Sequence, residues 1–279
     1  MCDIEKISCG CDLSRRRFIT RSMLAAAGLI VAPSIICAKA ADAGGLFDFM
    51  PSVAEQKKLG DQAAQQVLKQ YKEVHDGRSR EFEKVGLRLV GGLSQSDQKT
   101  WDFRFHVVDS KEVNAFALPG GNVFMFTGLY DKVQSEDALA AVTGHEMTHV
   151  RLQHWAKAYA DQQKRAIGIG ILLQATHAGS GWQSVASLAD NMIGLKYSRG
   201  EEDQADAGGL QDMVASGYNP EGMVQMFQML QKVAGNGGGV AGDFLSNHPL
   251  TSDRIKHTEA RIAALNGKTF PPLTPLPTS

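Results

Sequence analysis

Cysteine is scarce in this 279-residue chain, and the few cysteines lie at one end. All four, Cys2, Cys9, Cys11 and Cys37, fall within the first 40 residues. The body of the chain after residue 40 can therefore form no disulfide, no thiolate metal site and no cysteine nucleophile. Its chemistry must come from other side chains.

The chain also lacks an excess of charge of either sign. It carries 29 basic and 30 acidic residues, a formal net charge of −1. This balance excludes the basic surface of a dedicated nucleic-acid-binding protein and any polyacidic tail. With 43% hydrophobic and 21% charged residues, the composition is that of a soluble globular protein and not of a disordered or collagen-like one.

The first 40 residues have the organisation of an export signal. Ser-Arg-Arg-Arg-Phe at residues 14–18 resembles a bacterial twin-arginine signal and precedes an uncharged run at residues 22–38. Ala-Lys-Ala at 38–40 supplies small residues at cleavage spacing. We predict a cleaved signal peptide at residues 1–40 and a periplasmic chain that begins near Ala41. The alternative is an uncleaved inner-membrane anchor, because an uncharged run of 17 residues is at the lower limit of a membrane span.

Side-chain periodicity predicts an α+β fold. Apolar residues recur at three- and four-residue steps over residues 52–75 and 80–93, which predicts two helices. Residues 103–108 alternate in the manner of a strand. Segments 113–118 and 122–126 flank Pro-Gly-Gly, a strong turn signal, and predict a hairpin. The sequence thus predicts a small antiparallel sheet among many helices.

After Phe126 the pattern is helical almost to the end of the chain, with a glycine-rich interruption at residues 235–242. An apolar run at 167–173 is too short to cross a bilayer; we interpret it as a buried helix or loop, with a lid or substrate-contacting surface as the alternative. Residues 270–279 hold four of the nine prolines and predict an extended, mobile tail.

The strongest chemical signal is His-Glu-Met-Thr-His at residues 145–149. A chance match is expected on the order of once in a hundred such chains. His145 and His149 lie four residues apart on one predicted helix face, so both can offer a nitrogen to one ion, as tetrahedral zinc requires. Glu146 projects toward the same ion and can take a proton from its water. The alternative is two core histidines bonded to backbone carbonyls.

A catalytic zinc site needs a third protein ligand, and two adjacent glutamates about fifty residues downstream are candidates. Ser198 and Glu201 have capping-box spacing, which would occupy Glu201 at a helix start. Glu202 and Asp206 are four residues apart on one face, so Glu202 can ligate while Asp206 holds a histidine from behind. We predict Glu202 as the ligand, with a solvated acidic surface as the alternative.

Four motifs occur in an order that resembles a known family. HExxH is followed by Glu-x-x-Ala-Asp at 202–206; Asn-Ala-Phe-Ala-Leu-Pro-Gly-Gly at 114–121 precedes both, and Asn-His-Pro at 247–249 with Arg254 follows. Over residues 50–265 the chain resembles the gluzincin zinc metallopeptidases of the HtpX, BepA and Oma-type group, which also includes the CAAX prenyl proteases.

The resemblance implies a mostly helical, zincin-like domain over residues 41–269, with the small antiparallel sheet beside the HExxH helix. It implies one Zn²⁺ per chain bound by His145, His149 and Glu202, and Glu146 as the general base. Gln204 departs from the family, because many members have a second acidic residue there. No long apolar helix pair follows HExxH and no helical repeat follows Arg261, so the membrane-embedded and repeat-bearing members are poor models for this chain.

Two further segments are interpreted as parts of the site. Asn114, Ala115 and Phe116 would offer backbone groups as an edge strand to an extended peptide substrate, unless they form an ordinary inner strand. We interpret His248 as a gate or transition-state residue: it either blocks the open metal position or hydrogen-bonds the developing oxyanion. A histidine outside the site, capping the helix near Thr251, is the alternative.

The five remaining histidines lack a partner motif, and we interpret them as surface or core residues: His75, His106, His154, His177 and His257. Taken together, these features predict a zinc-dependent endopeptidase that cleaves unfolded or misassembled envelope proteins, with no nucleic-acid partner and with peripheral membrane contact left open. The alternative is a periplasmic chaperone or assembly factor whose zinc site is structural or self-inhibited. The intact Glu146 favours the enzyme, since a scaffold has no need of that carboxylate.

Overall fold

The computed structural model describes residues 49–174, 186–235 and 242–277. The predicted signal peptide at 1–40, His177 and most of the glycine-rich segment, residues 236–241, lie outside these ranges. The elements below all belong to one unit, residues 47–279. Among the described residues, no helix combines the length and apolarity that a membrane crossing requires.

The sheet has three strands in the order β1 (Arg104–Val108), β3 (Asn122–Phe126), β2 (Ala115–Ala117). β2 and β3 form the predicted antiparallel hairpin, whose turn contains Gly120 and Gly121 with φ of +94° and +127°. These angles suit glycine, which has no Cβ to clash.

The sheet is mixed and not wholly antiparallel as predicted, because β1 pairs with β3 in parallel. The chain reverses once between β1 and β2 and again at the hairpin turn, so β1 and β3 run in the same direction. Strand periodicity does not reveal which strands are neighbours. The α+β class and the mostly helical composition are confirmed.

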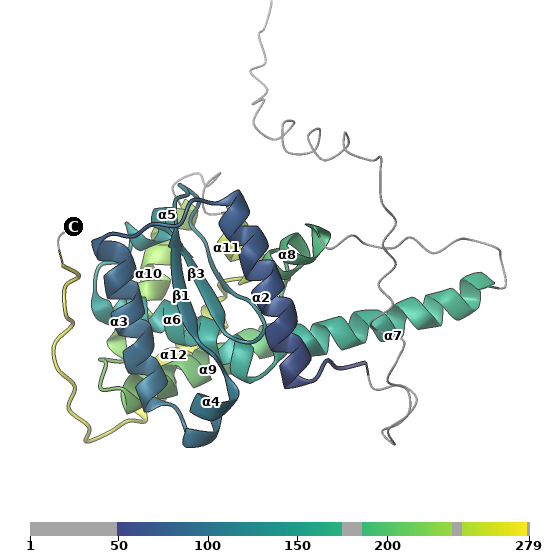
Figure 1. The fold of residues 1–279 in the computed structure, drawn as a ribbon. Helices are drawn as coiled ribbons and strands as arrows, with labels where there is room; N and C mark the ends of the chain where they lie inside the picture. The colour runs from purple at the N-terminus through teal and green to yellow at the C-terminus, as the bar shows by residue number, and fades with distance from the viewer. Residues whose placement is uncertain (1–48, 175–185, 236–241, 278–279) are drawn as a thin grey trace, which may run out of the picture. The chain divides into compact units, whose positions relative to one another are not determined.

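The central strand β3 is buried on both faces. Val123 and Met125 pack in a cluster with residues of α3 (Gly77–Gly92). Phe124 and Phe126 pack in a second cluster with residues of α2 (Val53–Gln70). The alternation follows from the two-residue period of a strand. Figure 1 shows α3 and α2 on either side of β1 and β3.

The predicted first helix is shorter than its pattern suggests. Ser52 and Glu55 form a reciprocal capping box at the start of α2, which ends at Gln70 and not near residue 75. The following residues extend beside β1, where the Val74 amide donates to the Val107 carbonyl at 2.8 Å. This tertiary pairing replaces the last predicted helical turn.

The rest of the unit is helical, as predicted after Phe126. The apolar run at 167–173 lies within α7, and the six-residue α4 has no counterpart among the predicted elements. These helices are α4 (Gln95–Thr100), α5 (Thr127–Tyr130), α6 (Glu136–Arg151), α7 (His154–Gln174), α8 (Ala186–Ile193), α9 (Arg199–Ala215), α10 (Glu221–Gly235), α11 (Gly242–Asn247) and α12 (Ser252–Ala263).

Helices α6 and α9 cross at a contact between glycines. A Cβ atom added to Gly209 would lie 2.8 Å from the backbone nitrogen of His145 and 2.9 Å from the carbonyl carbon of Gly144. One added to Gly208 would lie 2.5 Å from a methyl carbon of Thr148. Real Cβ atoms do not approach so closely, so the two backbones touch because side chains are missing there.

The described part of the predicted proline-rich tail is extended and lies against the first turn of α6. Asp137 accepts a hydrogen bond from the Thr274 amide at 2.7 Å, and the Thr274 carbonyl accepts one from the Glu136 amide at 2.8 Å. The Asn219 side chain donates to the Pro271 carbonyl at 2.8 Å. These bonds attach residues 271–274 to the body; the mobility of the tail in solution stays a prediction.

Candidate metal centre

One buried helix carries the HExxH motif. The side chain of Ser135 caps α6 by accepting from the Ala138 amide. Every residue of α6 is buried except the last, Arg151. His145, Glu146 and His149 therefore sit in the interior, where an imidazole or carboxylate needs specific partners.

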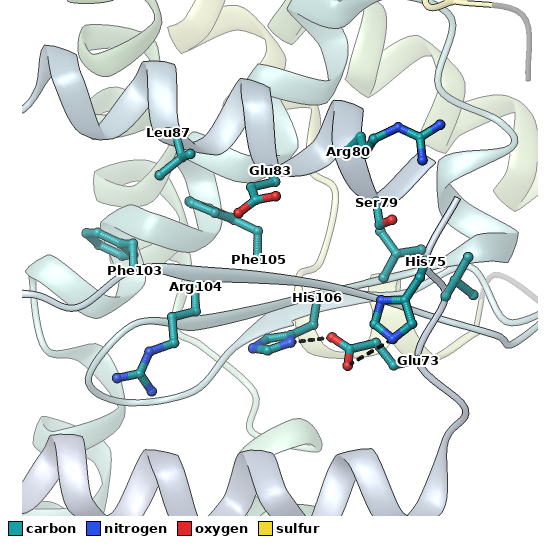
Figure 2. A pocket seen from close by; sticks show the side chains of 12 residues that line it. Glu73, His75, Ser79, Arg80, Glu83, Leu87, Phe103, Arg104, Phe105 and His106 are labelled. Carbon is teal, nitrogen blue, oxygen red and sulfur yellow. Dashed lines mark hydrogen bonds and ion pairs between the residues drawn. The ribbon is translucent and has the colours of Figure 1, made fainter. Parts of the chain in front are cut away.

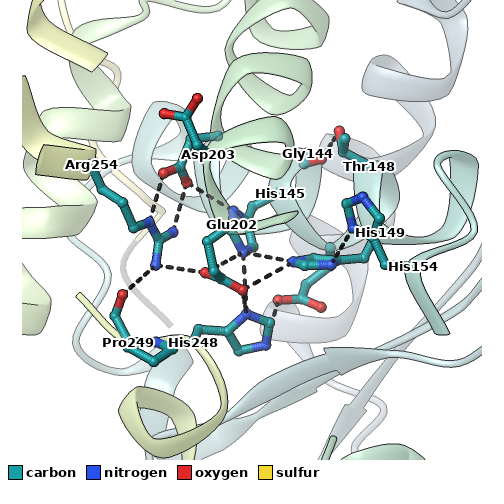
Figure 3. Close-up of polar contacts among 12 residues, drawn as sticks. Gly144, His145, Thr148, His149, His154, Glu202, Asp203, His248, Pro249 and Arg254 are labelled. Atoms are coloured by element: carbon teal, nitrogen blue, oxygen red, sulfur yellow. Dashed lines mark hydrogen bonds and ion pairs between the residues drawn. The ribbon is translucent and has the colours of Figure 1, made fainter. Parts of the chain in front are cut away.

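The third predicted ligand comes from the first turns of α9. Ser198 and Glu201 form the predicted capping box, so Glu201 bonds to the helix start and remains partly exposed. Glu202, one residue further, is buried and turns toward the two histidines (Figure 3). The glycine contact between α6 and α9 brings these side chains together.

The ligand atoms have the spacing of a small coordination sphere. The Nε2 atoms of His145 and His149 lie 3.1 Å apart. Glu202 oxygens lie 3.5 Å from each of these nitrogens. Ligands of a tetrahedral zinc ion are separated by roughly 3.3 Å, given Zn–N and Zn–O bonds near 2.0–2.1 Å. Two nitrogens and a carboxylate at this spacing suit zinc.

His248 joins this group, directly after α11. Its Nδ1 atom lies 2.8 Å from a Glu202 oxygen and 3.3 Å from Nε2 of His145. Possible ligand atoms of the four residues all lie within 4.8 Å of one another. The alternative of a histidine outside the site, capping the next helix, is therefore wrong; the Thr251 side chain caps α12.

Carboxylates and a guanidinium hold the ligands from behind. Asp206 contacts Nδ1 of His145 at 3.0 Å, the supporting contact predicted from the sequence. Arg254 donates to both Asp206 oxygens at 2.7 Å and forms an ion pair with Glu202 at 2.6 Å. The Asn-His-Pro motif with Arg254 does not indicate this bridge, because α12 carries no pattern that directs a side chain to α9.

A second contact that no sequence motif indicates involves His154, one of the five histidines interpreted as surface or core residues. Its Nδ1 atom lies 2.9 Å from Nδ1 of His149, and its Nε2 atom lies 3.2 Å from Oε1 of Gln204. The Tyr197 ring stacks on the His149 ring with centroids 3.9 Å apart. His149 is thus held on two sides. Its separation from His154 by five residues is not a one-face helical spacing, so no sequence signal identified the contact.

Burial and neighbouring charges set the protonation of the ligands. Burial lowers the pKa of His149 well below its ordinary value, which favours the neutral imidazole that a metal binds. Burial alone would raise the pKa of Glu202, but the nearby histidines outweigh it and the net shift is downward. Burial likewise opposes ionisation of Asp206, but Arg254 and His145 lower its pKa overall.

The pKa values of Glu146 and His248 are raised. Burial raises the pKa of Glu146, although His248, His145 and the backbone amide of Ala117 act against it. Burial alone would lower the pKa of His248, but Glu146 and Glu202 raise it overall. A carboxylate with a raised pKa accepts a proton more readily, as a general base requires.

The predicted edge strand lies at the edge of the sheet. β2 pairs with β3 on one side only. The Asn114 carbonyl accepts from the Phe126 amide and the Leu118 amide donates to the Asn122 carbonyl, so even-numbered residues face β3. The same alternation directs the backbone groups of Ala115 and Ala117 toward the open side. These two residues, and not Asn114 or Phe116, have outward-facing amides.

A separate cavity of about 470 Å³ lies between α3 and β1, at the opposite edge of the sheet from β2 (Figure 2). Its walls include Arg80, Leu87 and Phe105, and His106 contacts Glu73 there at 2.7 Å. Within the described residues, the cluster at His145 is the only group of three or more His, Asp or Glu side chains close enough to hold one metal ion. A metal ion would therefore be held by the side chains of α6, α9 and His248 and not in this cavity.

The known proteins to which the chain is similar are peptidases. A model of Peptidase family M48 matches residues 76–262, more than half of the chain. The chain is 29% identical to the beta-barrel assembly-enhancing protease of Yersinia pestis, over 79% of this chain and 46% of that protein. It is 29% identical to the mitochondrial metalloendopeptidase OMA1 of Schizosaccharomyces pombe, over 73% of this chain and 60% of that protein.

A third relative is closer in length. The chain is 26% identical to the metalloprotease LoiP of Escherichia coli (strain K12), over 76% of this chain and 82% of that protein. By contrast, the chain spans about half the length of the beta-barrel assembly-enhancing proteases that it matches.

Proposed function

The chain belongs to peptidase family M48, and on this premise we propose that it is a zinc-dependent endopeptidase of the bacterial cell envelope that hydrolyses unfolded or misassembled proteins. The observation that carries the proposal is Glu146. This carboxylate is buried beside the ligand cluster; its Oε1 atom has no hydrogen-bond partner among the described residues and lies 3.7 Å from Nε2 of His248. Burying such a group costs stability, so it indicates a chemical role.

The residues fit one zinc ion. His145, His149 and Glu202 supply the two nitrogens and one carboxylate of many catalytic zinc sites. When bound, a zinc ion would polarise the scissile carbonyl and lower the pKa of water. Asp206 and Arg254 would hold the ligands in orientation.

The protein's own residues would carry the remaining steps. Glu146 takes a proton from the attacking water and later returns it to the leaving amine. An extended substrate adds to the open side of β2, where the outward backbone groups of Ala115 and the carbonyl of Ala117 can bond to it, while the Ala117 amide faces Glu146. An unfolded segment suits this mode, because its backbone amides and carbonyls must be free of other hydrogen bonds before they can pair with β2.

The proposed location is the periplasm, reached by the twin-arginine route with the chain beginning near Ala41. The alternative is an inner-membrane anchor through the same N-terminal segment. The arginine pair and the small residues at 38–40 support the first option. Mass spectrometry of the N-terminus in envelope fractions distinguishes cleavage from retention.

A second candidate function is an assembly factor with a self-inhibited zinc site. The position of His248 favours self-inhibition, because its imidazole could take the coordination position on the metal that the attacking water would need. The buried Glu146 favours the enzyme, because a structural site has no use for it. Both observations are compatible with an endopeptidase whose metal site is reversibly blocked by His248.

We expect His248→Ala to raise peptide hydrolysis several-fold. Removal of a competing imidazole opens the position for water, whereas removal of an oxyanion donor would lower kcat by about a hundredfold. Initial rates on an unfolded substrate measure the difference. His257→Ala is a suitable control, because that histidine is exposed and bonds to Asp203. A large loss of kcat in the His248 variant would contradict the blocking role.

Removal of the metal tests the proposed function itself. We expect casein digestion to stop in excess chelator and to return on addition of zinc. The zinc-loaded protein should also melt at a higher temperature, because a ligand that binds only the folded state stabilises it. Digestion that continues after verified metal removal would refute the proposal. A chain that binds zinc but digests no unfolded protein would favour the assembly factor.

A further inference from the structure

We propose that His154 is a positioning residue that, with Gln204, holds His149 in the tautomer required for metal binding. The inference rests on the proposed zinc site and deepens it. It starts from the contact between two like atoms, Nδ1 of His149 and Nδ1 of His154, at 2.9 Å. This distance is a hydrogen bond only if one nitrogen carries a proton and the other does not.

The far side of His154 determines which nitrogen is the donor. Its Nε2 atom faces the side-chain oxygen of Gln204 at 3.2 Å, and that oxygen can only accept. The proton of His154 therefore lies on Nε2, and its Nδ1 atom is the acceptor. It follows that His149 donates through Nδ1–H and keeps a free lone pair on Nε2, the atom that faces His145 and Glu202. With His145 in the same tautomer, the 3.1 Å contact between the two Nε2 atoms is not a hydrogen bond but a pair of lone pairs directed at one point, as two ligands of one cation are. The reverse arrangement would place a proton where the metal must bind.

The two ligand histidines are thus supported by different chemistry. His145 has the Asp206 carboxylate behind Nδ1, itself paired with Arg254. Behind Nδ1 of His149 the acceptor is uncharged: it is the imidazole of His154, which is 0% exposed. Both arrangements select the same tautomer, but the second adds no negative charge beside a site that already contains Glu202 and Glu146.

The backbone explains why His154 can reach back. Gln153 has φ of +56°, the one non-glycine residue with positive φ among the described parts of the chain. Its left-handed conformation ends α6 and starts α7 at His154, so the His154 side chain turns toward His149 (Figure 3). The Gln56 side chain donates to the Gln153 side chain at 2.7 Å and helps to hold this turn.

The test compares zinc affinity in two His154 variants by competition with a chromophoric chelator. We expect His154→Phe to bind zinc 10- to 100-fold more weakly, the usual cost of losing a supporting residue. His154→Asn should bind almost as tightly as the unchanged chain, because its Oδ1 atom can accept from His149. Gln204→Leu should have a smaller effect than His154→Phe, because Gln204 is exposed and water can replace its amide.

A spectroscopic measurement tests the inference without metal and without a variant. In the chelator-treated, otherwise unchanged chain, ¹⁵N NMR of the histidine side chains should assign the proton of His149 to Nδ1. A proton on Nε2 would overturn the inference. So would a folded His154→Phe variant, with unchanged melting temperature, that binds zinc like the unchanged chain, or an Asn variant as weak as the Phe variant.

These outcomes are distinct from failure of the proposed function. If the unchanged chain binds no zinc, the zinc site is wrong, while the NMR measurement still decides the tautomer. If Glu202→Ala loses zinc and His154→Phe does not, the zinc site stands and the positioning role of His154 is wrong.

Discussion

Replacement of Glu146 by glutamine is expected to abolish peptide hydrolysis and to leave zinc binding intact. The amide has the shape of the carboxylate but cannot take a proton from water. Loss of a general base costs about a hundred- to ten-thousand-fold in rate. Glu146 is not one of the three proposed ligands, so the Glu146→Gln variant should still bind one zinc ion. Metal analysis and initial rates on an unfolded protein measure both quantities on one sample.

Glu136→Gln provides a matched control on the same helix. Glu136 is also buried, but its partner is Lys84 at 2.9 Å, near the first turn of α6 and away from the ligands. The same chemical change there should affect stability and not turnover. Hydrolysis at the unchanged rate in the Glu146 variant would refute the mechanism, and loss of zinc would show that Glu146 ligates the metal.

The second large effect is expected at the adjacent glutamates of α9. Glu202→Ala should lose zinc, because it removes a ligand and leaves Arg254 without its 2.6 Å partner. The loss in affinity should exceed the 10- to 100-fold that removal of a supporting residue costs. Equilibrium dialysis against buffered zinc measures it.

Glu201→Ala is the control for this prediction. It removes one half of the capping box with Ser198 and should lower the free energy of unfolding by about 1 kcal/mol, with zinc affinity maintained. Zinc retained by the Glu202 variant and lost by the Glu201 variant would reverse the assignment of the ligand.

The sequence predicts this site well where the chemistry is local. Residues four apart on a helix share a face whatever the rest of the fold does, so His145 with His149, and Glu202 with Asp206, could be paired from spacing alone. The capping box at Ser198 favoured Glu202 over Glu201 as the ligand by the same local reasoning. The hairpin was equally predictable, because Pro-Gly-Gly permits a turn with positive φ at Gly120 and Gly121.

Contacts between distant segments could not be predicted in this way. The parallel pairing of β1 with β3 depends on which strands are neighbours, and the bridge from Arg254 to α9 depends on where α12 packs. The contact of His154 with His149 could not be predicted, because it depends on the left-handed conformation of Gln153. Residues other than glycine seldom adopt that conformation. For His248, the sequence suggested proximity to the metal but left a place outside the site open.

Because α6 and α9 touch at their glycines, a metal ion bound by residues of both helices would act as a cross-link between them. The body of the chain has no cysteine with which to tie distant segments together. An ion held by His145, His149 and Glu202 would join the histidines of α6 to a glutamate of α9 that lies more than fifty residues further along the chain, and His248 would extend the link to the segment after α11. Closing a loop of this length restricts the unfolded chain as a disulfide does, and removal of the link is reversible. The same side chains would thus serve the reaction and replace the covalent bonds that the body of this protein lacks.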